Sequence, residues 1–404
     1  MLCQFTFQNF KSYRDEITLD MQAATIDDQE DNIIHAEDGK RFLPIAAIYG
    51  PNGGGKSNVL EAFSFLVSKI MVPISVVKSG NANEKMPSIH SKPFKFDKDS
   101  INEPSKFEVF FRTKKFEYKY NISIFDNKIK NESLIRRSIG GKKPTLIFER
   151  SDEIKAGTVL KGVKNADISP YMPYLSFLSI SYDISAINDV VSWFKNCEIH
   201  NFGNPIRDIV EFHLNDAKKY KKQVVEMLNE MDIDIVDFWD KKDNEGNIMV
   251  YTKHHALDGN NSELLLGEES DGTIKLFGSI PFIISSLKNG SPMIVDELDA
   301  KLHPKLLRYI IEIFKNMDIN KNQAQLIFTS HDLSTMNNRV FRRDEIWFAA
   351  KNDENASELY SLVEFRKENG EIPRKDETFD KQYLEGRYGA DPYLKHMLNW
   401  GEVL

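Results

Sequence analysis

The sequence is poor in the residues that mark secreted, metal-caged and membrane-spanning proteins. It contains only two cysteines, Cys3 and Cys197, which give neither a disulfide framework nor a cysteine-based zinc site. Its first residues show no basic segment followed by an apolar one, so we expect no signal peptide. The longest apolar run, near 277–287, is far shorter than the ~20 residues that a membrane helix needs. These absences predict a cytoplasmic protein with no membrane partner.

The sequence also lacks the patterns of several fibrous and catalytic proteins. No internal repeat is visible, and no heptad run is long enough for a coiled-coil arm. His254 and His255 have no cysteine or histidine partner at ligand spacing, so a metal cage is not expected. Asp232 and Asp234 form a D-x-D pair that could suggest a nuclease, but we interpret them as the end of a predicted helix. No nucleophile constellation of a nuclease or protease is present.

Acidic residues outnumber basic ones, and the net charge of −8 argues against a protein whose whole surface coats nucleic acid. One stretch departs from this balance, because residues 114–150 contain ten basic side chains and four acidic ones. Phe116, Tyr118 and Tyr120 lie among them, a pattern that suits a strand surface binding the backbone of DNA or RNA. A solvated outer face of a sheet gives the same pattern, so both interpretations stay open.

Hydropathy and turn residues divide the chain into parts of different character. Alternating runs predict two strands around Phe5 and Leu19, and continuous apolar runs predict buried strands at 42–49, 292–296 and 325–330. Helices are expected at 56–70, 206–232 and 304–316. The predicted parts are the N-terminal piece of an α/β core (1–105), an antiparallel β lobe (106–160), a mainly helical insertion (161–258), the C-terminal piece of the core (259–350) and a polar tail (351–404).

A glycine-rich loop lies between the strand at 42–49 and the helix at 56–70. Residues 50–57 read G-P-N-G-G-G-K-S and match the phosphate-loop pattern G-x-x-x-x-G-K-[ST] in the structural context that it requires. Glycines let backbone N–H groups turn toward phosphate oxygens, and the helix N-terminus favours negative charge. The residues predicted to bind a nucleotide are Gly50, Asn52, Gly53, Gly54, Gly55, Lys56 and Ser57. Lys56 is expected on the β- and γ-phosphates, and Ser57 on Mg²⁺.

Two later strands end in polar residues that suit the same site. The run P-M-I-V-D-E ends in Asp296 and Glu297, which we expect to bind Mg²⁺ and to act as the general base for an attacking water. The run Q-L-I-F-T-S is followed by His331, at the sheet edge where α/β proteins bind ligands. Each motif alone also fits a non-functional interpretation, namely an acidic turn for Asp296-Glu297 and a solvated loop histidine for His331. The phosphate loop earlier in the chain favours the functional interpretation.

Taken in order, the phosphate loop, S-D-G-T at 270–273, Asp296-Glu297, Asp299 and His331 resemble the ABC-type ATPases of the RecF, SMC and OLD group. The opening Q-N-F-K-S-Y resembles the N-terminal strand of that group. The segments S-D-G-T, E-L-D-A-K-L-H-P and Y-L-E-G-R-Y-G-A-D-P look most like short ATPases of abortive-infection and phage-defence operons (RloA- and AbiL-like, with PtuA as a cousin). The resemblance covers about 1–70 and 262–350, together with the tail.

The resemblance implies an α/β fold, namely a P-loop ABC-type ATPase head with an antiparallel β lobe and a mainly helical insertion. It implies ATP and Mg²⁺ as cofactors and a homodimer, or a higher even oligomer, that encloses the nucleotide. Ser270 and Gly272 would form the signature motif facing the second subunit's nucleotide. Asp299 would cross the interface in the D-loop, and His331 would contact the γ-phosphate. S-D-G-T departs from the transporter signature L-S-G-G-Q, and no Q-loop glutamine can be placed.

Three functions share this chemistry. The first is a nucleotide-gated sensor or scaffold that controls a separately encoded effector, a nuclease, in bacterial phage defence. The second is a RecF-like ATPase of DNA repair and recombination. The third is the ATPase subunit of a transporter, which the S-D-G-T segment and the N-terminal strand disfavour. The first is our prediction, and the neighbouring genes or co-purifying proteins would separate it from the second.

Overall fold

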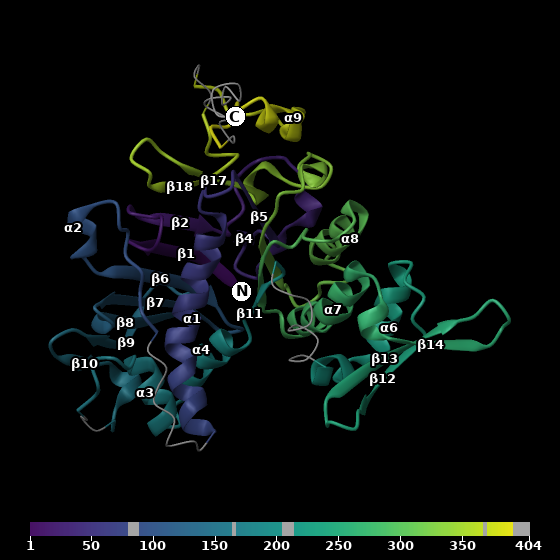
Figure 1. Cartoon of the computed structure of the whole chain (residues 1–404). Helices are drawn as coiled ribbons and strands as arrows, with labels where there is room; N and C mark the ends of the chain where they lie inside the picture. Colours follow the sequence, from purple (N-terminus) through teal and green to yellow (C-terminus); the bar gives the residue numbers. More distant parts are fainter. Residues whose placement is uncertain (80–88, 164–166, 204–213, 367–369, 391–404) are drawn as a thin grey trace, which may run out of the picture.

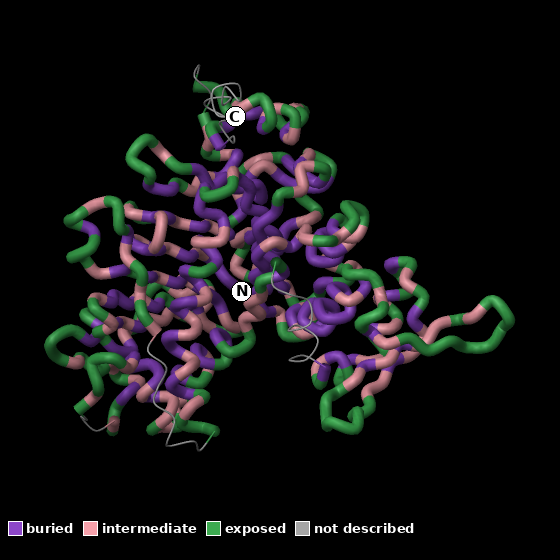
Figure 2. Tube along the Cα trace, in the orientation of Figure 1, coloured by how far each residue is buried: buried purple, intermediate pink, exposed green. Residues whose placement is uncertain are grey.

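The protein is built around two large sheets that lie side by side and share a packed interior (Figure 1). The computed structural model describes residues 1–79, 89–163, 167–203, 214–366 and 370–390. Buried residues form a continuous band through the centre in Figure 2, while exposed residues concentrate in the loops at the periphery. The mixed architecture confirms the predicted α/β class with an antiparallel β lobe.

The six-stranded sheet forms the α/β core. Its order is β11 (Glu198–Asn201), β15 (Pro292–Asp296), β16 (Gln325–Thr329), β5 (Ile45–Tyr49), β17 (Ile346–Lys351) and β18 (Ser357–Ser361). The first five strands run parallel and β18 is antiparallel. Every residue of β5, β15 and β16 is buried, as expected for parallel strands covered on both faces.

The seven-stranded sheet is the antiparallel lobe. Its order is β10 (Ile154–Ala156), β9 (Thr145–Arg150), β8 (Lys128–Ser138), β7 (Phe116–Phe125), β6 (Ser105–Arg112), β1 (Leu2–Gln8) and β2 (Ile17–Asp20). Burial alternates along β6 and β2, so one face is apolar and the other polar. The apolar face packs against helices α1 (Lys56–Lys78), α3 (Tyr174–Ser181) and α4 (Ser185–Lys195). The strands predicted around Phe5, Leu19 and within 106–150 are therefore present.

Two apolar clusters sandwich the parallel sheet. Ala46 and Ile48 of β5 join the cluster shared with the antiparallel lobe and α1. Ile45, Ala47 and Tyr49 point the other way, into the cluster shared with α7 (Asp271–Asn289) and α8 (Pro304–Lys315). Each face of the sheet therefore has its own hydrophobic core, and the carboxyl ends of its strands are held between them.

The insertion is less helical than the sequence predicted. It contains α3, α4 and α6 (Lys221–Glu230), but β11 joins the parallel sheet. Strands β12 (Asp237–Lys242) and β13 (Ile248–His255) form a separate antiparallel sheet with β14 (Asn261–Leu265), which follows the insertion. Figure 1 shows this small sheet projecting beside α6 and α7. Of the helix predicted at 206–232, residues 206–213 lie outside the described part of the chain. The remaining elements are β3 (Ile34–His35), β4 (Arg41–Phe42), α2 (Lys98–Ile101) and α9 (Phe379–Leu384).

Helix α1 extends beyond the predicted end at residue 70 and is long and apolar enough, by composition, to cross a membrane. Its most apolar window has a mean hydropathy of 1.7, but 56% of that window is buried inside the fold. Val59, Phe63, Leu66 and Ile70 repeat at helical spacing and are buried in the cluster with the lobe. The apolar residues of α1 therefore serve the protein core.

Candidate functional site

The carboxyl ends of four parallel strands meet at one edge of the six-stranded sheet. Gly50 follows β5, Glu297 follows β15, His331 comes two residues after β16, and Phe202 follows β11. Because the strands are parallel and adjacent, residues far apart in the chain are brought to one place. This edge is where open α/β sheets bind ligands.

The phosphate loop is supported on one side and open on the other. A Cβ at Gly50 or Gly54 would lie 2.1 Å or 2.5 Å from the carbonyl oxygen of Ala349 in β17. At Gly53 a Cβ would have nothing within 4 Å, and Asn52 is exposed. The glycines are therefore needed for close packing against β17, while the outer side of the loop faces open space.

Lys56 lies within this loop. Its ammonium group donates hydrogen bonds to the carbonyl oxygens of Gly50 at 2.8 Å and Pro51 at 3.2 Å. Burial lowers the pKa of Lys56, and the carboxylates of Asp296 and Glu297 oppose that shift. Charged phosphate oxygens accept stronger hydrogen bonds than neutral carbonyls do. The cation is therefore positioned at the loop with partners that an anion can replace.

Ser57 and Asp296 are in contact across the site. The Ser57 hydroxyl donates to Asp296 Oδ1 at 3.0 Å, and the Thr329 hydroxyl donates to the same oxygen at 2.6 Å. Magnesium usually takes one or two such oxygen ligands from the protein and the rest from phosphates and water. Among the described residues no group of three or more His, Cys, Asp or Glu side chains could hold a metal alone. The pair fits Mg²⁺ that arrives with a nucleotide.

Glu297 has an unusual backbone. Its φ angle is 54°, in the left-handed region that side-chain-bearing residues rarely adopt. The Thr329 hydroxyl accepts a hydrogen bond from the Glu297 N–H at 2.8 Å and thereby links this turn to Asp296. A Cβ at Gly203 would lie 2.3 Å from Glu297 Oε2, so the backbone of Gly203 lies directly against the carboxylate. Strained conformations of this kind concentrate at functional sites.

Asn201, at the end of β11, is a site residue that the sequence analysis missed. Its side-chain amide donates to Asp296 Oδ2 at 3.2 Å, and its Oδ1 accepts from the Gly203 N–H at 2.8 Å. Asn201 thereby orients the carboxylate expected to bind Mg²⁺ and fixes the loop over Glu297. The run E-I-H-N is too short and too polar to be recognised as a strand, and only its pairing with β15 reveals it.

The N-terminal motif supports the phosphate loop from a third direction. The Tyr13 hydroxyl donates to the carbonyl oxygen of Gly55 at 3.3 Å. The Ser12 hydroxyl contacts both Asn58 in α1 and Ser357 in β18, each at 2.7 Å. A Cβ at Gly55 would lie 2.5 Å from the Ser357 hydroxyl oxygen. The Q-N-F-K-S-Y segment therefore stabilises the beginning of α1 and the phosphate loop that precedes it.

The remaining predicted residues lie beside this cluster. Ser270 is the exposed N-cap of α7, and its hydroxyl accepts from the Thr273 N–H at 3.2 Å. A Cβ at Gly272 would lie 3.2 Å from the carbonyl oxygen of Lys301. Asp299 Oδ2 accepts from the His331 N–H at 3.1 Å, and Asp299 Oδ1 is buried with no hydrogen-bond partner among the residues that the structure describes.

The D-x-D and double-histidine segments have local partners. Asp234 accepts hydrogen bonds from the His255 N–H at 3.0 Å and pairs with its ring at 2.6 Å, while His254 pairs with Glu269 at 2.7 Å. Asp232 follows the end of α6, with a φ of 63°. These contacts stabilise the small sheet and its junction with α6 and α7.

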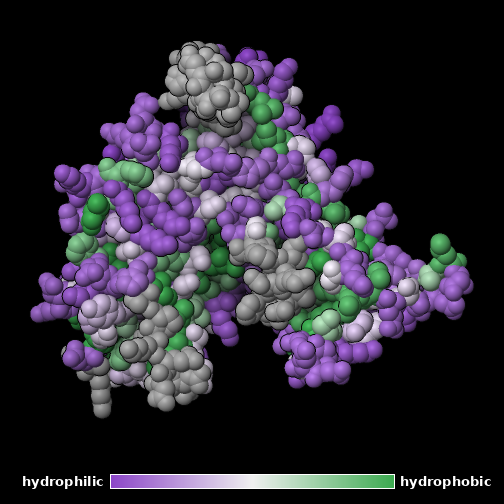
Figure 3. All heavy atoms as spheres, in the orientation of Figure 1, coloured by the Kyte–Doolittle hydropathy of each residue, from purple (hydrophilic) through white to green (hydrophobic). Residues whose placement is uncertain are grey.

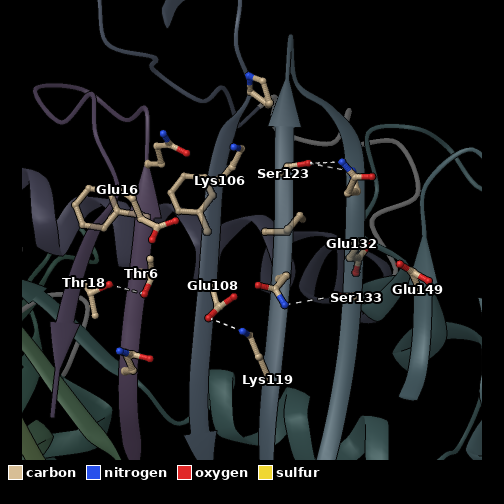
Figure 4. Close-up of a pocket in the computed structure, with 18 of the residues that line it drawn as sticks. Thr6, Glu16, Thr18, Lys106, Glu108, Lys119, Ser123, Glu132, Ser133 and Glu149 are labelled. Atoms are coloured by element: carbon tan, nitrogen blue, oxygen red, sulfur yellow. Dashed lines mark hydrogen bonds and ion pairs between the residues drawn. The ribbon is translucent and has the colours of Figure 1, made fainter. Parts of the chain in front are cut away.

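A separate groove of about 670 Å³ lies on the polar face of the antiparallel lobe. Figure 4 shows Thr6 and Thr18 bonded to each other and Glu108 paired with Lys119 across adjacent strands, at 2.9 Å in both cases. Figure 3, in the orientation of Figure 1, shows hydrophilic residues over much of the face that it draws. No residue predicted to bind nucleotide lines the groove, so it is distinct from the site at the strand ends.

Comparisons with solved structures show low similarity over most of the chain. The SMC head domain from Thermotoga maritima is 12% identical with a TM-score of 0.41, over 89% of this chain and 98% of that one. An SMC head bound to the C-winged helix domain of ScpA is 13% identical with a TM-score of 0.40, over 89% and 97%. RecF with ATP, from the RecFOR pathway, is 12% identical with a TM-score of 0.29, over 89% and 97%.

None of the curated proteins matches the chain. A family model does match, and it spans residues 45–337. This span begins with β5, includes the phosphate loop, Ser270, Asp296 and Glu297, and ends after His331. It therefore covers most of the parallel sheet and all four strand ends that form the site. The chain belongs to the ATPase family described as "AAA domain, putative AbiEii toxin, Type IV TA system".

Proposed function

We propose that this protein binds ATP with Mg²⁺, dimerises around the nucleotide and hydrolyses it, and that the nucleotide state of the dimer controls a separately encoded effector. The observation that carries the proposal is the one-sided phosphate loop. Its inner side is packed against β17 and β18, and its outer side at Asn52 and Gly53 is open. A triphosphate held there would expose its γ-phosphate until a second surface covered it.

Each residue of the cluster has a role in this proposal. Lys56 binds the β- and γ-phosphate oxygens, and Ser57 and Asp296 hold Mg²⁺, which neutralises phosphate charge. Glu297 accepts a proton from the attacking water, in the manner of a general base. His331 lies beside the γ-phosphate. Asn201 keeps Asp296 oriented and takes the place for which the sequence offered no glutamine.

The second surface is a second copy of the chain. Ser270 is exposed at the N-terminus of α7, where a hydroxyl and the helix dipole suit an anion. Asp299 belongs to the segment that would cross the interface, and its buried Oδ1 has no hydrogen-bond partner among the described residues. In the dimer, Ser270 and Gly272 of one subunit complete the cage around the nucleotide of the other.

The effector is proposed to be a nuclease acting in phage defence. The family description names a toxin of a toxin–antitoxin system, which is a pair of components. A partner that binds only one nucleotide state is controlled by its differential affinity, and a few kcal/mol shifts its occupancy by about several hundred-fold.

Co-expression with the neighbouring genes tests this function. Cells that express the full set should resist some phages or stop growing when infected, and Lys56→Ala should remove that response. The effector should co-purify with the ATPase in one nucleotide state only. If the protein purifies alone from its host, and its deletion sensitises cells to DNA damage but not to phage, the effector model is wrong and the RecF-like function replaces it.

A further inference from the structure

Lys275 is a buried lysine in the second turn of α7 whose partners are backbone carbonyls. Only 1% of the residue is exposed. Its ammonium donates to the carbonyl oxygen of Leu298 at 3.2 Å, to that of Glu297 at 3.5 Å and to that of Ala300. The Phe202 ring lies 4.8 Å from the same nitrogen. An ammonium has three protons to donate, so these carbonyls use its full capacity.

The carbonyls belong to the turn that carries the proposed general base. Glu297 begins this turn with a φ of 54°, and Lys301 ends it with a φ of 61°. Left-handed backbone at a residue with a side chain is unfavourable and persists only where neighbours hold it. Lys275 bonds carbonyls between these two strained positions and therefore stabilises the conformation that directs Glu297.

The signature residues lie at the same, N-terminal end of this helix. Ser270 caps α7 five residues before Lys275. At this end Asp271 pairs with Lys301 at 2.8 Å, and Gly272 lies against the Lys301 carbonyl. The first two turns of α7 are thus attached to the 297–301 turn at both of its ends. Contacts therefore connect the end of α7 that carries Ser270 with the turn that carries Glu297.

Packing alone does not explain a lysine at this position. Burial lowers the pKa of Lys275 to about 8, although Asp299 and Glu297 oppose the shift. Burying a charge is costly unless it is well paired, and an apolar side chain of similar length would fill the space at lower cost. A lysine at this position can donate hydrogen bonds to the three carbonyls, and a methionine of similar length cannot.

We propose that Lys275 is a positioning residue that couples the two nucleotide sites of the dimer. When Ser270 closes on the second subunit's nucleotide, Lys275 transmits that movement to Glu297 in its own subunit. This inference rests on the proposed function, because it assumes ATP hydrolysis at Glu297. Lys275 contacts no nucleotide in this scheme and acts through the 297–301 turn.

Lys275→Met tests the coupling in the full-length protein. We expect kcat for ATP hydrolysis to fall by about 10- to 100-fold, as a misplaced catalytic group typically does, with ATP affinity unchanged. Lys275→Arg retains charge and donors and should restore most of kcat. Lys69→Met is the matched control, because Lys69 is also buried and bonded to a carbonyl, that of Asn127, but lies in α1 beyond the site. That variant should keep the wild-type kcat.

Three outcomes overturn the inference: an unchanged kcat in Lys275→Met, an equal loss in Lys69→Met, or a loss that arginine does not restore. If Lys275→Met does not fold, Lys275→Gln, whose amide retains two donors, decides by the same comparison of kcat with ATP affinity. Failure of the proposed function looks different, because the wild-type protein would then not hydrolyse ATP. A normal Lys275→Met enzyme alongside an inactive Glu297→Gln enzyme rejects the coupling alone.

Discussion

The two large sheets of the protein differ in how completely their buried charged side chains are paired. In the antiparallel lobe, Glu117 is buried and bonded to Lys40, Arg112 and Arg137, so its charge is fully compensated. At the edge of the parallel sheet, three carboxylates lie close together near Lys56, and Asp299 retains a buried oxygen without a partner. Compensated charge holds a structure together, whereas incompletely compensated charge leaves room for a ligand.

The basic stretch 114–150 also contains both side chains with partners and exposed side chains in turns. Arg137 and Lys119 pair with acids inside the lobe, and Arg136 lies 4.5 Å from the centre of the Phe116 ring. Another part of the stretch lies in two turns at one end of the sheet, and a hydrogen bond from the Ile139 N–H to the Lys115 carbonyl joins these turns at 3.1 Å. These turns present four exposed lysines, namely Lys114, Lys115, Lys142 and Lys143.

The largest expected effect is at the phosphate loop. Lys56→Ala should abolish ATP binding, because the loop loses the side-chain cation that lies among its carbonyls. Calorimetric titration with ATP and Mg²⁺ measures this directly. An affinity equal to that of the wild type would mean that the parallel sheet edge is not the nucleotide site, and the contrast between the sheets would lose its functional meaning.

Glu297→Gln should bind ATP and hydrolyse it about 10²–10⁴-fold more slowly, since an amide cannot accept the proton of water. The ATP-bound dimer should then accumulate and be visible by gel filtration with light scattering. The charge-preserving control is Glu297→Asp, which keeps a carboxylate on a shorter side chain. A Glu297→Gln protein that stays monomeric with ATP contradicts the enclosed-nucleotide dimer.

Ser270→Arg should leave ATP binding intact and block dimer closure, because a bulky cation replaces the exposed N-cap hydroxyl. Mixing this variant with Lys56→Ala gives dimers in which one composite site is damaged twice and the other is intact. Part of the ATPase activity should return in such mixtures. If demonstrated heterodimers remain inactive, the two sites do not turn over independently.

The lysine-rich end of the lobe is expected to affect nucleic-acid binding but not hydrolysis. Reversing Lys114, Lys115, Lys142 and Lys143 to glutamate should abolish duplex binding, and wild-type affinity should fall steeply with salt. Reversal of Lys128 and Lys130, at the opposite end of β8, is the control. Tight duplex binding by the fourfold variant would favour the alternative interpretation, in which the stretch is a solvated face of the sheet.

The smallest effect is expected inside the lobe. Burial opposes ionisation of Glu117, but hydrogen bonds from Lys40, Arg112 and Arg137 outweigh it and lower its pKa. Arg137→Gln should lower the free energy of unfolding by about 1 kcal/mol or less and leave ATP hydrolysis unchanged.

The pH dependence of this effect follows from its sign. A lowered native pKa stabilises the fold above the ordinary glutamate pKa of about 4.3, and this stabilisation is lost as pH falls through the native value. Thermal unfolding of the wild type and of Arg137→Gln should therefore converge on acidification. Altered ATPase activity in the variant would show that the lobe and the site are not independent.

Sequence patterns predicted the elements whose signal is local. The phosphate loop, β15 and β16 could be recognised because each is a continuous apolar strand followed by a distinctive polar motif. The role of Asn201 could not be recognised, since β11 is defined by a neighbour almost a hundred residues later. Strands β12 and β13 lie in the region predicted to be mainly helical, and β12 gives a weak strand signal because it is polar, with charged residues in D-F-W-D-K-K. The role of Lys275 could not be predicted either, because it depends on contacts with carbonyl groups of residues 297–300 that are distant in the sequence.

The placement of β5 at the centre of the parallel sheet has a consequence for synthesis on the ribosome. β5 is made early, but both of its neighbours, β16 and β17, lie near the far end of the chain. The strands β6 to β9 pair with sequence neighbours and can form hairpins as they emerge. The strand that leads into the phosphate loop therefore keeps both edges unpaired until β16 and β17 have been synthesised, and unpaired strand edges favour aggregation.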